Sequence, residues 1–549
     1  MTMAIPYGPG PLPVMFGIAD DIGMVETIND LLDWDPAQCT VSPGHRLLAI
    51  AANFLTEGAA LVHLEEFYAQ TDTETLFGEG IEPSHLNDDA LARGLEKFVE
   101  AGCRRVTESV LLEAATREGI DTGILHGDTT SFSVHGEFDS EDYTDDTAVT
   151  LTYGHSKDNR PDLKQFNIGL GVNRDGVPVV GDILDGNRSD MSWNTELVGR
   201  LRNTLETDEP LVYVGDSKVV REETFEAAAD QEIDLLTRLP KTFNLTDAVI
   251  EDAIDTDDWI DVGTLSDRED ATHYRVQRRP GTLYDQAVSC VVVHSSSKAA
   301  TADERVSITV ASAESSLESA LEAVEDRTFA CEPDAQSALE TWREEHADPC
   351  FDVTANIIET ERKKSRDGPG RPPKDWDPYE TVYTIEGSIE RNEAAISRRK
   401  AIESCFVVVT TIQDTEAWPA TRVLEEYKHQ HTVERRFPLL KDPKLVGPIY
   451  AKRDEQVEAL GYVLILALLI YSVIERRARA SLADAEEPME IVGAQPTDRP
   501  TGHRVLERFQ NVMVLDVDGD RVVPDNVELP DRVLGLIGLD RSIYGVQSD

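Results

Sequence analysis

The sequence predicts an α/β protein in which a mixed sheet with flanking helices is interrupted by a mainly β insertion and preceded by a helical domain. Three observations carry this prediction. Apolar residues recur at helical spacing before residue 120, alternation begins at residue 123, and strand and helix patterns then follow one another up to residue 240. At 549 residues, the chain exceeds what one hydrophobic core usually fills. We therefore expect several structural units.

Residues 1–120 are expected to form the helical domain. Apolar positions at helical spacing occur in "HRLLAIAANFLTEG" and "ALARGLEKFVEAGCRRVTESVLLEAA", and an Asn-Asp-Asp helix start lies at Asn87. No strand pattern interrupts these segments, so the domain is predicted to be helical throughout.

Residues 121–240 are expected to form the first part of an α/β core. "GILHGDTTSFSVHGEF" alternates, and "QFNIGLGVNRDGVPVVGDILDGN" contains two apolar strands joined by a turn at Arg174-Asp175-Gly176. This gives three consecutive antiparallel strands. Helix, strand, helix and strand follow in "MSWNTELVGRLRNTLETD", "PLVYVGDS", "REETFEAAADQ" and "IDLLTRLP". With a later helix, this is the element order of a ribonuclease-H-like catalytic core.

The rest of the chain divides into three parts. Residues 241–418 show short strands with charged connections, which predicts a β-rich insertion. Residues 419–485 are expected to complete the core, with one helix starting after Pro419 and an apolar helix around Leu460–Ile474. This apolar run has 15 residues, which is short for a membrane span and favours a buried helix. Residues 486–549 form an acidic, proline-punctuated tail region.

The composition is strongly acidic. The net charge of −52 comes from 104 acids against 52 bases, of which 38 are Arg and 14 are Lys. Acids spread over the whole chain, with few Lys, are typical of a surface adapted to high salt and not of a single acidic tail. This charge does not exclude a nucleic-acid partner, because the local charge of a groove decides binding and salt screens the rest.

Cysteine usage and the N-terminus bear on the compartment. Six Cys are scattered without a C-x-x-C pair, so neither a zinc site nor a disulfide framework is predicted. The stretch "MTMAIPYGPGPLP" has no basic region and no signal-like apolar run. A reducing, cytoplasmic location and no membrane partner are therefore expected.

Three acids lie where an α/β core of this order needs carboxylates. Asp128 is in mid-strand in "LHGDTTSF", Asp216 ends the strand "LVYVGDS", and Glu434 lies on the late helix. Carboxylate oxygens that converge from such positions can hold Mg²⁺ or Mn²⁺, and a pair of ions would serve phosphodiester chemistry. The alternatives are an edge or turn for Asp128, a helix cap for Asp216 and a solvated side chain for Glu434.

The helix around Glu434 has a polar face. Tyr427, Gln430, Glu434 and Lys441 stand at i, i+3, i+7 and i+14 of the expected helix, within about 60° of one another. Arg435 and Arg436 flank this face and are expected to meet phosphates. Pro438 removes a backbone donor and is expected to bend or end the helix before Lys441.

These residues resemble the Y-(2)-R-(3)-E-(6)-K signature of cut-and-paste insertion-sequence transposases of the DDE class. The segments "LHGDTTSFSVHGEF", "YGHSKDNRPDLKQF", "LDGNRSDMSWN" and "VGDSKVV" also occur in order, as in that group. The resemblance implies that Asp128, Asp216 and Glu434 are metal-binding catalytic acids for two Mg²⁺ or Mn²⁺ ions. It also implies that Tyr427 and Lys441 grip the phosphates of the transposon end, while Gln430 replaces the expected Arg.

The resemblance further implies partners and a reaction. The enzyme would bind double-stranded DNA at the transposon ends through its N-terminal helices, act as a homodimer in the synaptic complex, cleave the DNA and join it to target DNA. We identify no helix-turn-helix in those helices. Because Gln430 stands where the signature has Arg, the question whether the reaction includes a strand-hairpin step stays open. A recombinase-type nucleophile at Tyr427 is disfavoured, because the Arg-rich surroundings that it would require are absent.

Two further stretches are candidates for DNA contact. Lys157, Arg160 and Lys164 in "GHSKDNRPDLK" are placed to meet backbone phosphate, although a solvated loop explains them equally simply. Arg371 in "PGRPPK" resembles the Gly-Arg-Pro core of a minor-groove hook, and a flexible basic loop is the alternative.

Two rival functions remain open. A non-catalytic DNA-binding relative of a transposase would keep the fold and the grip on DNA, and the three intact acids disfavour it. A ribonuclease-H-like nuclease would cleave without strand transfer, and it would need neither the basic signature nor the insertion.

Overall fold

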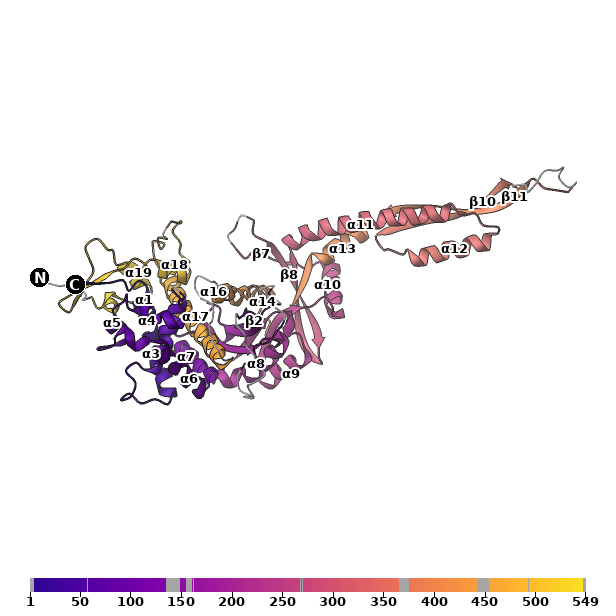
Figure 1. Cartoon of the computed structure of the whole chain (residues 1–549). Helices are drawn as coiled ribbons and strands as arrows, with labels where there is room; N and C mark the ends of the chain where they lie inside the picture. The colour runs from indigo at the N-terminus through magenta and orange to yellow at the C-terminus, as the bar shows by residue number, and fades with distance from the viewer. Residues whose placement is uncertain are drawn as a thin grey trace, which may run out of the picture.

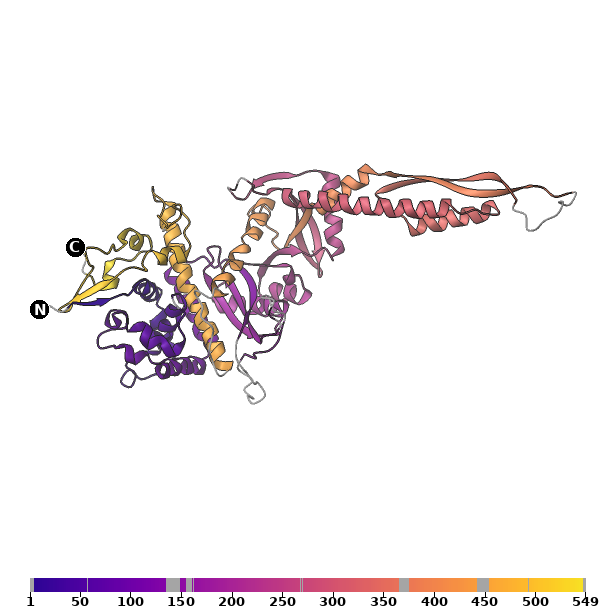
Figure 2. The ribbon, with the colours of Figure 1, turned by 45° about the horizontal axis from the view of Figure 1, so that its top comes forward.

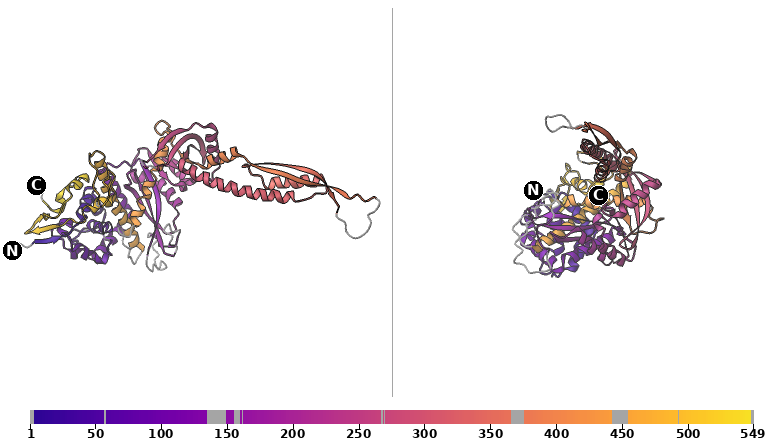
Figure 3. Two further views of the ribbon diagram at one scale, coloured as in Figure 1. Left: turned by 90° about the horizontal axis from the view of Figure 1, so that it is seen from above. Right: turned by 90° about the vertical axis from the view of Figure 1, so that its right-hand side faces the viewer.

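The computed structural model describes residues 4–56, 58–134, 149–154, 160, 162–266, 268, 270–364, 375–441, 454–491 and 493–546. It has a body and an arm. The arm comprises residues 296–404 and extends away from the body, as two views at right angles show (Figure 1 and Figure 3). The two chain ends lie near each other at the end of the body opposite the arm (Figure 1).

The body is built on a large mixed sheet, so the predicted α/β class is confirmed. Nine strands of the described residues form it in the order β4-β3-β2-β5-β6-β12-β9-β8-β7. Strands β2, β3 and β4 are antiparallel, whereas β5 and β6 run parallel to β2. The strands are β2 (Ile124–Ser133), β3 (Gln165–Val172), β4 (Pro178–Asp185), β5 (Leu211–Gly215), β6 (Ile233–Leu239), β7 (Ile260–Thr264), β8 (His273–Leu283), β9 (Gln286–Ser295) and β12 (Cys405–Thr410).

Helices cover both faces of this sheet. On one face lie α8 (Asp190–Leu205), α9 (Glu222–Asp230) and α10 (Asn244–Thr256), and their apolar residues share a core with β5, β6 and β9. On the other face, α14 (Ala420–Lys428) packs on β6, β8, β9 and β12. The burial of β5 on both faces explains its continuous apolar sequence "LVYVG".

The elements predicted for residues 121–240 are present. The turn between β3 and β4 closes when the amide of Asn173 donates to the carbonyl of Val177 over 3.0 Å. Gly176 in this turn has φ +79°, a left-handed conformation that favours glycine. The sequence therefore predicted both the strands and the turn correctly.

The segment expected to be a mainly β insertion differs from the prediction. Its strands β7, β8, β9 and β12 extend the sheet of the body, and the arm between β9 and β12 is half helical. The helix α11 is 30 residues long, and its buried positions recur at helical spacing from Ala302 to Val324 among exposed polar and charged residues. The arm contains α11 (Ser296–Glu325), α12 (Glu332–Glu345), β10 (Phe351–Lys363), β11 (Tyr379–Arg391) and α13 (Glu393–Glu403).

The N-terminal helices and the C-terminal tail form one unit with a common core. The long helix α17 (Asp454–Ala483) runs between this unit and the sheet (Figure 2). Strand β1 (Ala4–Tyr7) pairs with β13 (Val514–Val517), which pairs with β14 (Asp520–Val522). The helices are α1 (Leu12–Asp21), α2 (Met24–Leu31), α3 (Pro43–Phe54), α4 (Leu64–Tyr68), α5 (Thr73–Phe77), α6 (Asp88–Ala101), α7 (Cys103–Arg117), α18 (Gly502–Glu507) and α19 (Asp531–Leu536).

Helix α17 is the apolar helix predicted to be buried. Among the described residues it is the one helix long and apolar enough to cross a membrane, yet 94% of its most apolar window is buried inside the protein. This is the setting of a core helix in a soluble protein.

Candidate active site

Asp128 and Asp216 occupy matching positions on neighbouring parallel strands. The pairs Ile124 with Val212 and His126 with Val214 fix the register of β2 and β5. Continued by two residues, this register sets Asp128 opposite Asp216, which directly follows β5. Both side chains are partly exposed. Asp128 and Asp216 therefore lie side by side at the carboxyl end of β5, where α/β sheets open into their sites.

The residue before Asp128 must be small. The ring of Tyr213 crosses Gly127, and a Cβ added there would lie 1.9 Å from the Tyr213 hydroxyl oxygen. That hydroxyl donates to Asn194 Oδ1 over 2.5 Å. Burial, together with the charges of Asp128 and Asp216, raises the pKa of Tyr213 well above its ordinary value. The carboxylates of Asp128 and Asp216 therefore both act electrostatically on the buried phenol of Tyr213.

Two residues that the sequence reasoning missed complete this end of the sheet. Asp190, in the first turn of α8, accepts a hydrogen bond from the Thr129 hydroxyl and forms an ion pair with Lys218. Burial would lower the pKa of Lys218, but Asp190, with Asp216 and Asp128, raises it. Asp190 resembled an ordinary helix-start acid in the sequence, and the signal that was available was Lys218, two residues after Asp216.

The predicted late helix is broken into three short pieces. These are α14, α15 (His431–Glu434) and α16 (Phe437–Lys441). The breaks fall at residues 429–430 and 435–436, the second of them just before Phe437-Pro438. One continuous helical face from Tyr427 to Lys441 was therefore a wrong expectation.

Glu434 is exposed at the end of α15. Burial raises the pKa of Tyr427, and the carboxylates of Asp216 and Glu434 raise it further, although Arg238 opposes them. The Tyr427 phenol therefore lies within electrostatic range of both acids. Within the part of the chain that is described, no group of three or more His, Cys, Asp or Glu side chains is placed to hold a metal ion. The structure thus sets Asp128 beside Asp216 by strand register, and the three predicted acids do not form such a group.

Gln430 connects the Glu434 segment to the strand of Asp128. It is 6% exposed, and its amide nitrogen donates to the carbonyl of Gly127 over 2.8 Å. The sequence predicted a surface position facing DNA. The amide instead fixes the backbone next to Asp128.

A buried ionic network around Glu426, about one helical turn before Gln430, holds the same part of the chain in place. Glu426 of α14 is fully buried, 3.0 Å from His126 Nε2 and 2.6 Å from Arg174 Nη2. Burial alone would raise the pKa of Glu426, but His126, Arg174 and His429 outweigh it and hold the pKa below its ordinary value. The network joins α14 to β2 and to the turn between β3 and β4.

Arg436 also differs from its predicted role. It is 4% exposed and pairs with the buried Glu475 of α17 at 2.9 Å. Its Nε donates to the carbonyl of Gly176 over 2.8 Å. These contacts hold the chain after Glu434 against the sheet, so Arg436 is an anchor of the fold and not a residue at the surface.

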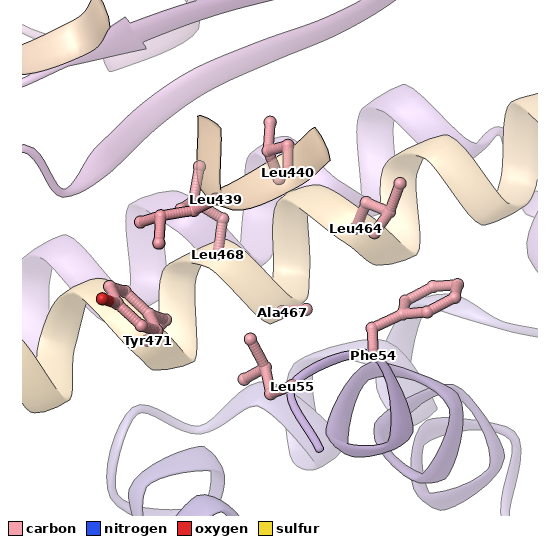
Figure 4. A pocket seen from close by; sticks show the side chains of 8 residues that line it. All are labelled: Phe54, Leu55, Leu439, Leu440, Leu464, Ala467, Leu468 and Tyr471. Atoms are coloured by element: carbon pink, nitrogen blue, oxygen red, sulfur yellow. The ribbon is translucent and has the colours of Figure 1, made fainter. Parts of the chain in front are cut away.

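A small apolar cavity lies where α16 meets the helices beneath it (Figure 4). Leu439 and Leu440 of α16 face α17, and the end of α3 closes the other side. The lining residues are Phe54, Leu55, Leu439, Leu440, Leu464, Ala467, Leu468 and Tyr471. Because the lining is apolar except for Tyr471, the cavity is part of the packing of α16.

The other predicted DNA contacts are dispersed. Arg435 is exposed, Lys441 ends α16, and Lys164 lies next to β3. Arg160 forms an ion pair with Asp162 at 2.8 Å. Lys157 and Arg371 lie outside the described residues.

The end of the arm carries a basic hollow. Arg362, Lys363, Lys364, Trp376 and Glu380 line it, and Arg362 forms an ion pair with Glu380 at 2.9 Å. Three cations and an indole ring thus gather at the tip of an otherwise acidic chain.

Comparison with known families gives one match. Residues 10–112 match a family described as a domain of unknown function, DUF4277, and this range spans α1 to most of α7. No curated protein matches the chain.

Proposed function

We propose that this protein is a DDE-class transposase, a metal-dependent enzyme that cleaves DNA and joins it to a target. The observation that carries the proposal is the matched position of Asp128 and Asp216 on β2 and β5, with Glu434 on the segment bonded to the same strand. The order β4-β3-β2-β5-β6, antiparallel then parallel, supports a ribonuclease-H-like core.

The donor set suits a hard divalent cation. Asp128 and Asp216 offer carboxylate oxygens, which Mg²⁺ and Mn²⁺ prefer, and the site already attracts the ammonium group of Lys218. Asp128 and Asp216 would hold the metal, and Glu434 would join them as the third acid. When bound, one or two such ions would activate the attacking oxygen and stabilise the leaving oxygen.

The surrounding residues would position DNA. Tyr427 lies within electrostatic range of both Asp216 and Glu434, and Arg435 and Lys441 follow on the same segment. Cations at such positions bind phosphates and set the register of the duplex. Double-stranded DNA is therefore the proposed partner, and pairing of two transposon ends implies a homodimer.

The test uses purified protein with the DNA that brackets the gene, a target plasmid and Mg²⁺ or Mn²⁺ at high salt. We expect cleavage and joining by the wild type and by D230N, which changes an exposed acid of α9. We expect D128N, D216N and E434Q each to lower the cleavage rate by at least about 100-fold. Equal cleavage by wild type and D128N would overturn the assignment.

The same assay separates the rival functions. Cleavage without joining identifies a nuclease, and DNA binding with no cleavage identifies a non-catalytic relative. Near-identical inverted repeats around the gene, with short target duplications outside them, would support transposition independently.

A further inference from the structure

Both the backbone amide and the side chain of Lys218 lie close to the carboxylate of Asp216. Its amide nitrogen donates to Asp216 Oδ1 over 2.9 Å, and its Nζ lies 4.0 Å from Asp216 Oδ2. The short helix η4 (Ser217–Val219) imposes this geometry, because Asp216 is its N-cap. Both oxygens of one proposed metal ligand are thus turned toward the same residue.

Asp190 holds the other side of the ammonium group. It accepts from Lys218 Nζ and from the hydroxyl of Thr129, the residue after Asp128. The Asp190 side chain is 15% exposed and that of Lys218 is 42% exposed. The ammonium therefore lies between an acid of α8 and the acid that follows β5, with Asp128 also acting on it.

We propose that Lys218 is a tethered counter-ion that competes with the divalent cation for Asp216, and that Asp190 retains the ammonium when the metal binds. The inference rests on the proposed function, because it requires a metal at Asp128 and Asp216. The reason is electrostatic. Without a cation, Asp128, Asp190 and Asp216 repel one another, and Lys218 offsets part of that repulsion. A divalent cation at Asp216 meets a positive charge 4.0 Å from Oδ2, which lowers its affinity, and Asp190 keeps the ammonium from coming closer because it already pairs with it.

Substitutions of Lys218 and of Asp190 are expected to change the affinity for Mn²⁺ in opposite directions. K218M removes the competing charge, so Mn²⁺ should bind about tenfold more tightly. K218R keeps the charge and should stay near the wild type. D190N removes the group that retains the ammonium, so Lys218 should move onto Asp216 and Mn²⁺ should bind about tenfold more weakly. K218M combined with D190N should restore at least wild-type affinity.

The experiment measures Mn²⁺ bound to the full-length protein without DNA, by the electron paramagnetic resonance signal of free Mn²⁺. K400M serves as the matched control, because Lys400 forms an ion pair with Asp303 at 2.7 Å in the arm. Circular dichroism checks that each variant is folded, and K218Q replaces K218M if the latter is not. D216N should abolish the binding in every background.

The outcomes separate this inference from the proposed function. Equal Mn²⁺ affinity in wild type, K218M and K400M, with binding lost in D216N, overturns the counter-ion role alone. Mn²⁺ binding that D216N leaves intact, or no binding by any variant, overturns the proposed metal site and the counter-ion with it. Tighter binding in K218M with weaker binding in D190N supports the inference, since loss of structure would not shift the two in opposite directions.

Discussion

The side-chain amide of Gln430 donates to the backbone carbonyl of Gly127, 2.8 Å away. This single bond joins two segments 303 positions apart. Gly127 directly precedes Asp128, and Glu434 follows Gln430 by one helical turn. The distance between the first and third acids of the proposed site is therefore controlled by a buried amide that does not itself carry charge.

Gln430→Ala is expected to lower the free energy of unfolding by about 1–3 kcal/mol, because the buried carbonyl of Gly127 loses its donor. DNA cleavage should fall as well, since Glu434 loses its connection to β2. Urea unfolding and the cleavage assay measure the two effects. The matched control is Gln413→Ala, in which an exposed Gln also donates to backbone carbonyls. Equal stability losses in the two variants would contradict a special role for the bond.

Glu426→Gln tests the buried network. The substitution removes the ionic partner of the partly exposed Arg174 and should cost about 1–3 kcal/mol of unfolding free energy. The pKa of Glu426 in the folded protein lies below its ordinary value of 4.5. Its contribution is therefore complete above pH 4.5 and is lost as the pH falls through the folded value.

Urea unfolding of wild type and Glu426→Gln at pH values from 7 downward measures this term. The stability difference between the two proteins should be constant above pH 4.5 and should shrink below it. Acids remote from the network titrate alike in both proteins, so their contributions cancel in this difference. A difference that grows on acidification would reverse the assigned sign.

Gly127→Ala is expected to destabilise the protein by about 1–3 kcal/mol, because the new methyl group overlaps the Tyr213 phenol. The strands β2 and β5 must shift to relieve the overlap. The rate of DNA cleavage should therefore fall by more than the loss of stability alone would cause. Gly535→Ala in α19 is the control: no atom lies within 4 Å of its added Cβ, and alanine favours helix. Thermal unfolding should show a lower midpoint for Gly127→Ala and an unchanged or higher midpoint for Gly535→Ala.

Removal of the outer arm tests its contribution to DNA binding. Glu314 and Arg391 form an ion pair at 2.6 Å across the arm, so a short Gly-Ser turn can replace residues 315–390. The body should stay folded, because most of the apolar core of the arm lies within the removed residues. The plot of log affinity for DNA against log salt should become shallower by about 0.9 for each phosphate that Arg362, Lys363 and Lys364 neutralise in the intact protein. An unchanged slope, measured by fluorescence anisotropy, would show that the tip does not bind DNA.

Local sequence patterns were sufficient to predict the strands and helices of the body between residues 121 and 240. Alternation in β2, the apolar runs of β3 and β4 and the Arg174-Asp175-Gly176 turn determine these strands almost without help from distant residues. Helix α11 was missed because its buried Ala and Val are small and lie among many acids. Its amphipathic face becomes recognisable only when β10 and β11 pack against it.

The acids Asp128 and Asp216 could be found from their positions on strands, since parallel neighbours must share an edge. The broken helix was harder. Helical spacing places Gln430 beside Glu434, but it cannot tell that the Gln430 amide turns inward to Gly127 or that Arg436 pairs with Glu475. These interactions join segments far apart in sequence, and single-chain periodicity carries no information about them.

The pairing of β1 with β13 has a consequence for synthesis on the ribosome. The strand Ala4–Tyr7 emerges before any strand of the large sheet, but its partner Val514–Val517 emerges after all of them. In the helical unit, β1 stays unpaired until β13 has been synthesised. The sheet that carries Asp128 and Asp216 can form earlier. A nascent chain therefore completes the strands that carry Asp128 and Asp216 before it completes the unit that contains residues 10–112.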